Sequence, residues 1–311
     1  MQRLLRYLVL FCAASLLLTA TAPPASHRAG AASPASAVLA ANFTLTLTST
    51  GPGTATGGGN YPAGSVAILN ATPNTGAVFT GWFIDGRFDG WADQRDITMT
   101  ADHAVVATFA AIPSFPDVLP ADPAYEAINQ LAARRIIRGY QNGFFGPNDP
   151  TMRAQMAALI ARACPGNPQS GPGIGPQTWD LENHGNSFPD QGFIDPDLWR
   201  NVGTLNFHNV ARGYQDGTYR PTDSVLYAQV ISFITRTMVA KGYWQEVTVD
   251  DPSLYPNISI ATGHRFDVLT YYQYADAIPG TNPDANWDTW DQPATRAWFA
   301  LALWQALDSY F

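Results

Sequence analysis

The sequence predicts an α+β protein in which a small mixed-β module is followed by an all-α bundle with pseudo-threefold symmetry. Two observations carry this prediction. Apolar and polar residues alternate with a period of two near residue 42, which is typical of a half-buried strand. One phrase then recurs three times between residues 113 and 311, which indicates three copies of a helix-loop-helix unit.

The amino terminus has the pattern of a secretory signal. Arg3 and Arg6 precede an apolar run at residues 8–18, and small residues close the signal at residues 1–22. The run is too short for a permanent transmembrane helix. Cys12 lacks the small preceding residue of a lipoprotein signal. We therefore expect an exported protein with no transmembrane or lipid anchor.

Residues 23–41 are mainly Ala, Ser and Pro, and we expect a flexible linker there. Because Pro23 would hinder cleavage directly before it, the signal cut can also fall later in this tract.

Loss of residues 1–40 removes three arginines and no acid, so the net charge goes from −8 to −11. An acidic chain argues against nucleic acid as a partner. Cys164 is then the one cysteine left, which excludes an internal disulfide.

The β module is expected at residues 42–110. Phe43, Leu45 and Leu47 alternate with threonines in the first strand. The further strands are expected near residues 66–72, 77–83, 97–99 and 104–109, with glycine-rich turns at 51–59 and 61–64.

Three phrases in this module resemble the divergent branch of the internalin-type B-repeat family. They are Ala63-Gly64-Ser65-Val66, Ala71-Thr72-Pro73-Asn74-Thr75-Gly76 and Phe79-Thr80-Gly81-Trp82. The resemblance implies a spacer or adhesive unit of bacterial surfaces with no chemistry of its own. Trp82 is either a carbohydrate platform or a core residue, and its place between Gly81 and Phe83 favours the core.

The recurring phrase has three parts in each copy. The first copy is Ser114-Phe115-Pro116-Asp117-Val118, residues 138–147, and Arg153-Ala154-Gln155. The second is Ser187-Phe188-Pro189-Asp190, residues 212–221, and Tyr227-Ala228-Gln229. The fainter third is Tyr255-Pro256-Asn257, Ile278-Pro279-Gly280, and Thr295-Arg296-Ala297.

Each copy is expected to form a hairpin of two helices. In the first helix of the first copy the apolar stripe is Tyr125, Ile128, Leu131 or Ala132, and Ile136, and in the second helix it is Met156, Leu159, Ile160 and Ala163. Gly139 is expected to end the first helix in a left-handed conformation. Residues 297–307 are apolar on nearly every side, so the second helices are expected to form an inner bundle.

These motifs resemble the S-layer homology (SLH) family. The repeats would span residues 113–164, 186–247 and 248–311, with a linker at 165–185. The resemblance implies a secreted cell-surface protein, held non-covalently on the cell wall by a wall-attached polysaccharide that often carries pyruvate ketals. It implies no enzymatic activity and no cofactor, and we expect a monomer.

Arg153 and Arg296 are the candidate ligand clamps, because each occupies the position of the family's Thr-Arg-Ala-Glu arginine. A guanidinium can hold a sugar carboxylate with two parallel hydrogen bonds. The helix N-terminus would add free amides and a favourable dipole. The alternative is a solvated arginine in the first helical turn.

Departures from the motif weaken some copies. Gln155 stands where the family has glutamate, Tyr227 replaces the arginine in the second copy, and Trp298 replaces the glutamate in the third. At most two carboxylate grooves are therefore expected.

Gln155 and Tyr227 remain candidate ligand-binding residues, and four further candidates are Asp117, Asp190, Tyr140 and Tyr214. The aspartates would accept sugar hydroxyls and the tyrosines would present flat faces to a pyranose ring. The structural alternative, which the residue types favour, is an aspartate capping the following helix and a tyrosine closing the core.

Catalytic or metal chemistry has little support. The five histidines share no ligand spacing, and no nucleophile elbow or phosphate loop occurs. The expected function is anchoring to the envelope. A self-assembling surface-layer subunit is the alternative, and an enzyme that degrades wall polysaccharide is a weaker one.

Overall fold

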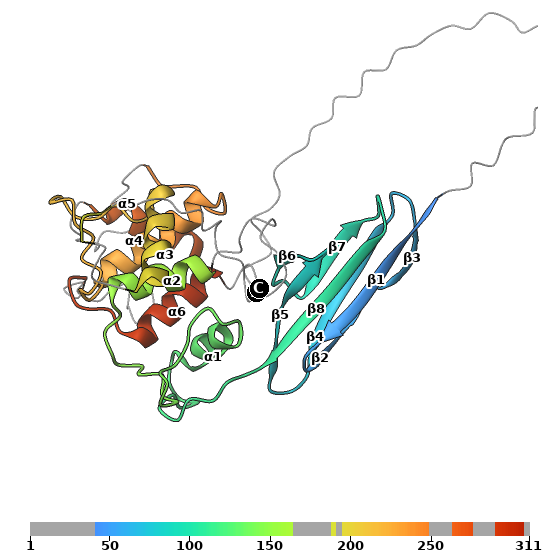
Figure 1. Cartoon of the computed structure of the whole chain (residues 1–311), viewed down its shortest axis with the longest axis horizontal. Coiled ribbons are helices and arrows are strands. Elements are labelled where there is room, and N and C mark those ends of the chain that lie inside the picture. The colour runs from blue at the N-terminus through green and yellow to red at the C-terminus, as the bar shows by residue number, and fades with distance from the viewer. Residues whose placement is uncertain (1–40, 164–187, 191–194, 249–262, 276–289, 308–311) are drawn as a thin grey trace, which may run out of the picture. The chain divides into compact units, whose positions relative to one another are not determined.

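The computed structural model describes residues 41–163, 188–190, 195–248, 263–275 and 290–307. Eight strands precede six helices in these ranges (Figure 1), so the α+β prediction is confirmed. The predicted signal peptide, most of the linker before the module, the linker at 165–185 and Cys164 lie outside the described residues. So do the phrases at 255–257 and 278–280.

The β module consists of two sheets. The five-stranded sheet has the order β3-β1-β8-β5-β6, and the three-stranded sheet has the order β2-β4-β7. The strands are β1 (Asn42–Thr50), β2 (Gly53–Thr56), β3 (Gly59–Pro62), β4 (Val66–Pro73), β5 (Ala77–Ile84), β6 (Arg87–Gly90), β7 (Gln94–Thr98) and β8 (His103–Ala111). Strands β1 and β8 pair in parallel, whereas the other pairs are antiparallel.

Alternation along the strands builds the core of the module. In β4, Ala67 and Leu69 are fully buried, whereas Val66 and Ile68, which alternate with them, are each 51% exposed. Trp82 from β5 is 0% exposed, and its Nε1 donates a hydrogen bond to the Ala92 carbonyl at 2.9 Å. The prediction that Trp82 belongs to the core is therefore confirmed.

The turn predicted at residues 51–59 is wrong in part, because it contains strand β2. Gly51 has a φ of +91°, and a Cβ there would lie 2.1 Å from the Phe109 carbonyl oxygen. The glycines permit a close approach of β2 to β8 rather than a long turn. Strands β2, β3 and β6 were not expected because each has four residues and little apolar alternation.

The helices are α1 (Tyr125–Ala133), α2 (Arg153–Ala163), α3 (Pro196–Phe207), α4 (Tyr227–Ala240), α5 (Arg265–Ala275) and α6 (Arg296–Leu307). Helix α1 ends earlier than expected. Arg135, with φ of 60°, takes the left-handed conformation that we expected at Gly139. Gly139 is needed for a different reason, since a Cβ there would lie 2.6 Å from the Phe115 ring.

Within each predicted hairpin, the two helices are not the pairs that pack most closely, although α5 and α6 of the third copy do contact each other. Helix α3 packs on α2, α5 packs on α4, and α1 packs on α6. Each first helix thus covers the second helix of another copy. The second helices also contact each other, α4 with both α2 and α6. In the apolar helix α6 the buried residues lie on about half of the circumference and the others are half-buried, so the expected inner position holds for one side of the helix.

Three backbone segments that precede α2, α4 and α6 close on one another. The Val225 amide donates to the Thr151 carbonyl at 2.8 Å, the Ala294 amide to the Val225 carbonyl at 2.8 Å, and the Thr151 amide to the Ala294 carbonyl at 2.9 Å. We call these three bonds the backbone ring. It joins the backbone before α2, α4 and α6, although these segments are far apart in the sequence.

Within the described residues, no helix combines the length and apolar character needed to cross a bilayer.

Replacing Trp82 with alanine is expected to destabilise the β module by about 3–5 kcal/mol, because the change leaves a large cavity and an unpaired carbonyl. Hydrogen exchange of the β5 and β8 amides measures this effect. Val66→Ala, at an exposed position of the same module, serves as the control and should leave exchange almost unchanged. Equal protection in the two variants would contradict the core role of Trp82.

Candidate ligand-binding site

Asp117 and Asp190 hold the loops that follow the first helices. Asp117 accepts hydrogen bonds from the Phe145 and Gly146 amides at 2.8 and 2.7 Å. Asp190 accepts equivalent bonds from the Tyr219 amide at 3.0 Å and the Arg220 amide at 2.7 Å. The expectation that Asp117 caps the next helix is wrong, since α1 has no side-chain cap. Both carboxylates instead fix a loop 28 to 30 residues further along the chain.

The electrostatic setting of Asp117 favours its ionised form. Burial opposes ionisation, but the two loop amides and the nearby Arg296 charge outweigh that cost and hold the pKa of Asp117 below its usual value.

The Arg153 side chain extends from α2 of the first copy to the loop of the second copy. Its Nε donates to the Tyr219 carbonyl at 2.8 Å, and its Nη1 donates to Gln229 Oε1 at 3.0 Å. Its guanidinium carbon lies 4.7 Å from the ring centres of both Tyr214 and Tyr219. Arg153 is only 3% exposed, so the alternative of a solvated arginine is wrong.

Arg296 makes the corresponding contacts with the loop of the first copy. Its Nε donates to the Phe145 carbonyl at 2.8 Å, and its Nη2 donates to the Arg138 carbonyl at 2.7 Å. The Tyr140 and Phe145 rings lie 4.7 and 4.6 Å from its guanidinium carbon. Burial lowers the pKa of Arg296, against the opposing effect of the nearby acidic groups.

The amides at the start of α2, α4 and α6 were expected to be free for a ligand, and this is wrong. The first two amides of each helix donate to backbone carbonyls of another copy at 2.9–3.3 Å. The pairs are Arg153 to Asp223, Ala154 to Pro221, Tyr227 to Gln292, Ala228 to Trp290, Arg296 to Asp149 and Ala297 to Pro147. The helix starts are therefore docking points between copies.

Tyr227 occupies the first helical position of α4, where the other two helices have arginine. It is half-buried, and its ring meets the Trp298 ring edge-on at 4.3 Å between centres. Two substitutions from the motif thus pack against each other. This junction between the second and third copies has an aromatic contact in place of a guanidinium.

Gln155 and its counterpart Gln229 have different surroundings. Gln155 is half-buried and makes no side-chain hydrogen bond to another described residue. Gln229 Oε1 accepts from the Leu226 amide as well as from Arg153, and its Nε2 donates to the Tyr214 hydroxyl at 3.3 Å. The sequence analysis did not select Gln229, although its place in the motif could have identified it.

Tyr140 and Tyr214 are not closed into the core, contrary to the structural alternative. Tyr140 is 43% exposed and donates a hydrogen bond to Asp149 at 2.9 Å. Burial of its hydroxyl and this bond raise the pKa of Tyr140. Tyr214 is half-buried, and the guanidinium of Arg220 lies 4.1 Å from its ring centre. Both rings lie at copy junctions, each against the guanidinium of an arginine from another copy.

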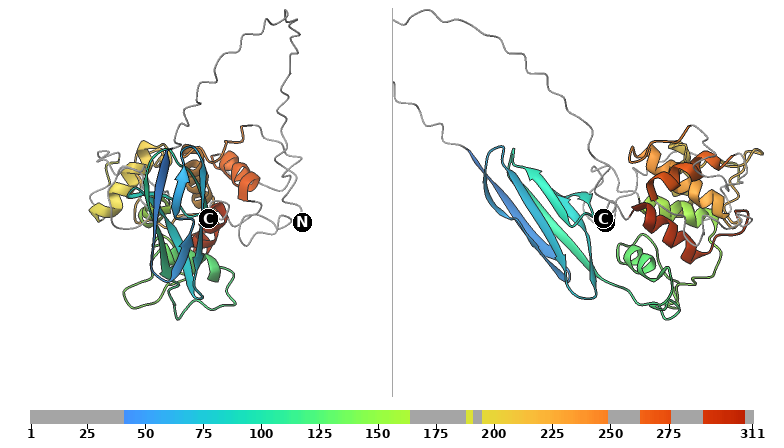
Figure 2. Two further views of the ribbon diagram at one scale, coloured as in Figure 1. Left: turned by 90° about the vertical axis from the view of Figure 1, so that its right-hand side faces the viewer. Right: turned by 180° about the vertical axis from the view of Figure 1, so that it is seen from behind.

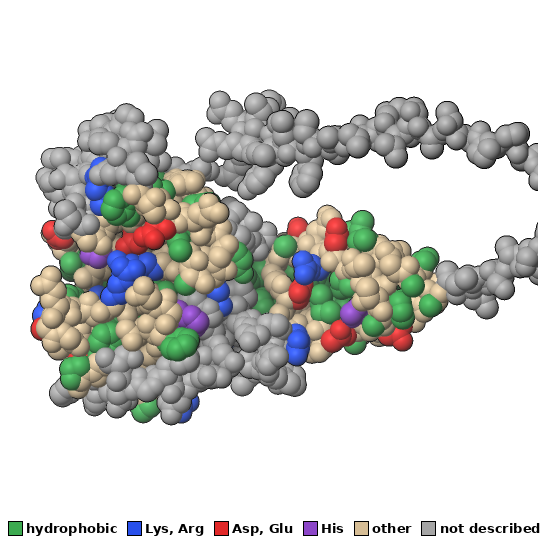
Figure 3. All heavy atoms as spheres, turned by 90° about the horizontal axis from the view of Figure 1, so that it is seen from above, with side chains coloured by type: hydrophobic (Ala, Val, Ile, Leu, Met, Phe, Trp, Pro, Cys, Tyr) green, Lys and Arg blue, Asp and Glu red, His purple; other side chains and the backbone are tan. Residues whose placement is uncertain are grey.

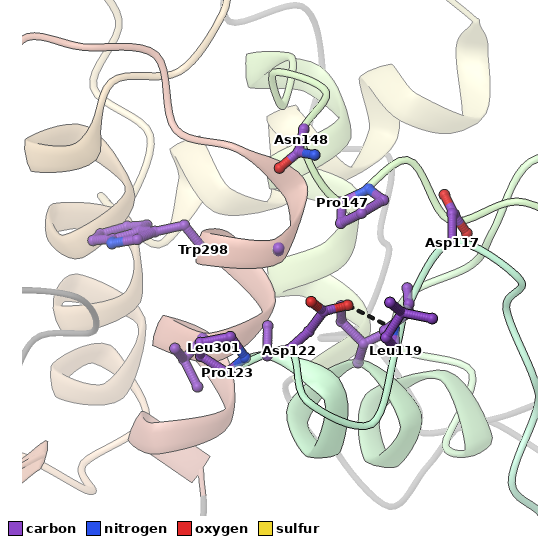
Figure 4. A pocket seen from close by; sticks show the side chains of 12 residues that line it. Asp117, Leu119, Asp122, Pro123, Pro147, Asn148, Trp298 and Leu301 are labelled. Carbon is purple, nitrogen blue, oxygen red and sulfur yellow. Dashed lines mark hydrogen bonds between the residues drawn. The ribbon is translucent and has the colours of Figure 1, made fainter.

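A pocket of about 410 Å³ opens at the junction of the first and third copies (Figure 4). Residues before α1, residues after the loop of the first copy, and residues of α6 surround it. They are Asp117, Val118, Leu119, Asp122, Pro123, Ala124, Ile128, Pro147, Asn148, Ala297, Trp298 and Leu301. The Asp122 carboxylate accepts from the Leu119 amide at 2.6 Å, and Asn148 is exposed. Apolar walls with a few polar groups suit a small polar ligand.

Charge is mixed on the helical segment. On the face shown in Figure 3, basic side chains lie beside acidic ones, with no broad basic area. In the described ranges, no cluster of three or more His, Cys, Asp or Glu side chains could hold a metal ion.

Arg296→Ala is expected to destabilise the helical segment by about 2–4 kcal/mol, because it leaves two partly buried carbonyls without donors. Urea denaturation followed by far-ultraviolet circular dichroism measures the change. Arg87→Ala removes the same charge from an exposed site and should stay within about 0.5 kcal/mol of the parent. A similar small effect of Arg296→Ala would show that its hydrogen bonds are dispensable.

Asp117→Asn is expected to cost about 1–3 kcal/mol near neutral pH, because a carboxylate accepts two amides more strongly than one amide oxygen does. The folded pKa of Asp117 is lowered, so its contribution is complete above the unfolded value of about 3.9 and is lost as pH falls through the folded value. The stability gap between parent and variant should be constant above about pH 5 and close below about pH 4. Asp93→Asn, at an exposed carboxylate, should show no such gap.

Comparison with known domain families finds two matches. Residues 43–113 match the divergent InlB B-repeat domain, and residues 114–157 match the S-layer homology domain. The first match covers the β module, and the second covers α1, the loop held by Asp117 and the start of α2.

Curated relatives match parts of the chain. A surface layer protein of Brevibacillus choshinensis is 27% identical over 150 residues, which is 47% of this chain and 12% of the relative. A middle cell wall protein of Brevibacillus brevis is 24% identical over 158 residues, covering 46% and 14%. A cell surface protein of Thermoanaerobacter kivui is 27% identical over 138 residues, covering 43% and 16%. The chain thus matches less than one fifth of the length of these relatives.

The domain matches and the relatives together point to a structural or anchoring protein. They indicate a secreted protein of the cell surface or cell wall. The chain is thus similar to the divergent InlB B-repeat domain over residues 43–113 and to the S-layer homology domain over residues 114–157.

Proposed function

We propose that the helical segment anchors the protein non-covalently to the bacterial envelope by binding a wall-attached polysaccharide. The SLH match supports the anchoring role. The observation that carries the proposal is a pair of junctions between copies, each with a buried arginine beside a tyrosine, Arg153 with Tyr214 and Arg296 with Tyr140. A pocket lies at the second of these junctions.

In this proposal residues 113–164, 186–247 and 248–311 are three SLH repeats with pseudo-threefold symmetry. The backbone ring supports it, because one equivalent bond leads from each copy to the next. The matched positions of Asp117 and Asp190, and of Arg153 and Arg296, support it as well. The third copy takes part in the same backbone bonds as the other two, although its sequence is only weakly similar to theirs.

The pocket at the junction of the first and third copies is proposed to hold an uncharged sugar residue. Its carboxylates, Asp117 and Asp122, would repel an acidic group. Each carboxylate still has lone pairs that can accept a hydrogen bond from a sugar hydroxyl. The exposed Asn148 amide group can donate or accept a further one. A pocket of about 410 Å³ is large enough for one or two sugar rings.

An acidic substituent such as a pyruvate ketal would bind beside a guanidinium. Among described residues, Arg153 Nη2 and Arg296 Nη1 have no hydrogen-bond partner, and neither arginine forms an ion pair. Tyr140 and Tyr214 lie over these guanidinium groups and would contact the sugar face. Two such junctions on one rigid body would bind a repetitive polymer more tightly than either alone.

Co-sedimentation with purified envelopes tests the proposal. The full chain is expected to sediment with intact envelopes and to stay in solution when the polysaccharide has been stripped chemically. Equal sedimentation with both preparations would contradict polysaccharide binding.

Variants of the pocket test where the sugar binds. Leu119→Ser combined with Asn148→Ala is expected to weaken binding about tenfold, because both exposed side chains line the pocket and neither supports the fold. Gln141→Ala, an exposed amide outside the pocket, is the matched control. Unchanged binding of the double variant, with an unchanged circular dichroism spectrum, would remove the pocket from the site.

Self-assembly into a surface layer is a second candidate, favoured by the likeness to a surface layer protein. Light scattering over a dilution series separates the two. An anchor stays monomeric, whereas a lattice subunit forms ordered sheets as its concentration rises.

A further inference from the structure

We infer that the β module is a mechanical clamp, in which strand β8 resists extraction when the chain is pulled from the helical segment. The observation is the position of the two strands through which the chain enters and leaves the module. This inference concerns the β module alone and does not depend on what the helical segment binds.

The chain enters the module at β1 and leaves it at β8, and these strands are parallel neighbours. Their register runs from Leu45 opposite His103 to Thr50 opposite Thr108. Since parallel strands run in the same direction, the start of β1 and the end of β8 lie at opposite ends of the sheet (Figures 1 and 2). Because Leu45 and not Asn42 lies opposite His103, the two points are roughly 35 Å apart along the strands.

Tension along the chain therefore acts along the shared ladder. Backbone hydrogen bonds of a ladder run across the strands, so a pull along the strands loads all of them together. A pull at a hairpin end would instead break them one after another. The β1–β8 pair is loaded in the first way, which is shear.

A second ladder holds β8 on its other side. Strand β5 pairs with β8 along its whole length, from Ala77 opposite Ala111 to Ile84 opposite Val105. Strand β8 lies inside the five-stranded sheet and cannot slide without breaking both ladders.

Side chains along β8 reinforce the clamp. Val105, Ala107 and Phe109 point into the core and are at most 6% exposed. A Cβ on Gly53 would lie 2.3 Å from the Phe109 ring, so the start of β2 lies close against this ring. Sliding β8 by one residue would move all three side chains out of the core.

Single-molecule force spectroscopy of the full chain, carrying Cys12→Ser and Cys164→Ser, tests the inference. With handles at the two chain ends, the module should unfold in one event that releases on the order of 200 Å of chain. This event is expected at a higher force than the unfolding of the helical segment in the same trace. A module that yields before the helical segment would overturn the inference.

Changing the direction of pulling gives the sharper test. Thr75 is exposed in the turn before β5, and the Ile112 amide bonds the Gly76 carbonyl, so residues 75 and 112 lie at the same end of the ladder. A handle at Thr75→Cys and one at the carboxyl end would peel β8 from β5. The force should fall at least about twofold relative to end-to-end pulling. Equal forces in the two directions would contradict a shear clamp.

Two core variants separate mechanical from equilibrium stability. Val105→Ala lies in β8 on the load path, whereas Leu69→Ala lies in β4 of the other sheet. Both positions are buried, and Leu69→Ala removes more of the side chain. Val105→Ala is nevertheless expected to lower the end-to-end unfolding force more, because forced unfolding depends on the barrier along the pulling direction. The opposite order would show that the force reports overall stability only.

Discussion

The helical segment depends on the closure of three distant stretches of backbone on one another. Thr151, Val225 and Ala294 each donate one amide bond to the next stretch, and the following helices begin by docking their first amides on carbonyls of another copy. Backbone groups make these bonds, so they tolerate changes of side chain. This explains how the second junction keeps its geometry although Tyr227 stands in the place of an arginine.

The same closure determines what remains for a ligand. Burying a cation is costly unless its donors are used, and Arg153 and Arg296 meet this requirement with carbonyls and aromatic faces rather than carboxylates. The hydrogen bonds and ring contacts of the two arginines thus stabilise the junctions between copies. For the ligand that we propose, the groups left for recognition are Tyr140 and Tyr214, the guanidinium nitrogens without a partner among the described residues, and the pocket beside α6. In that proposal an arginine variant would change both folding and binding, whereas an Asn148 variant would change binding alone.

The β module uses a different constraint. Its central strand β8 carries ladders on both sides, and its alternate side chains fill the core between two sheets. Glycines such as Gly51 and Gly53 let the chain pass close to Phe109, where any side chain would collide. The strands through which the chain enters and leaves the module therefore also carry residues of its core. In the clamp that we infer, the force needed to unfold the module depends on the direction in which the chain is pulled.

The sequence by itself determined the order of the two parts, most strands of the β module, the second helix of each copy and the core position of Trp82. Local periodicity encodes these features, because alternation and helical spacing act within one element. The tertiary structure alone decided that helices of different copies pair, that the helix starts are occupied, and that Asp117 holds a loop instead of a helix. These outcomes depend on contacts between residues far apart in the chain, which no local pattern records.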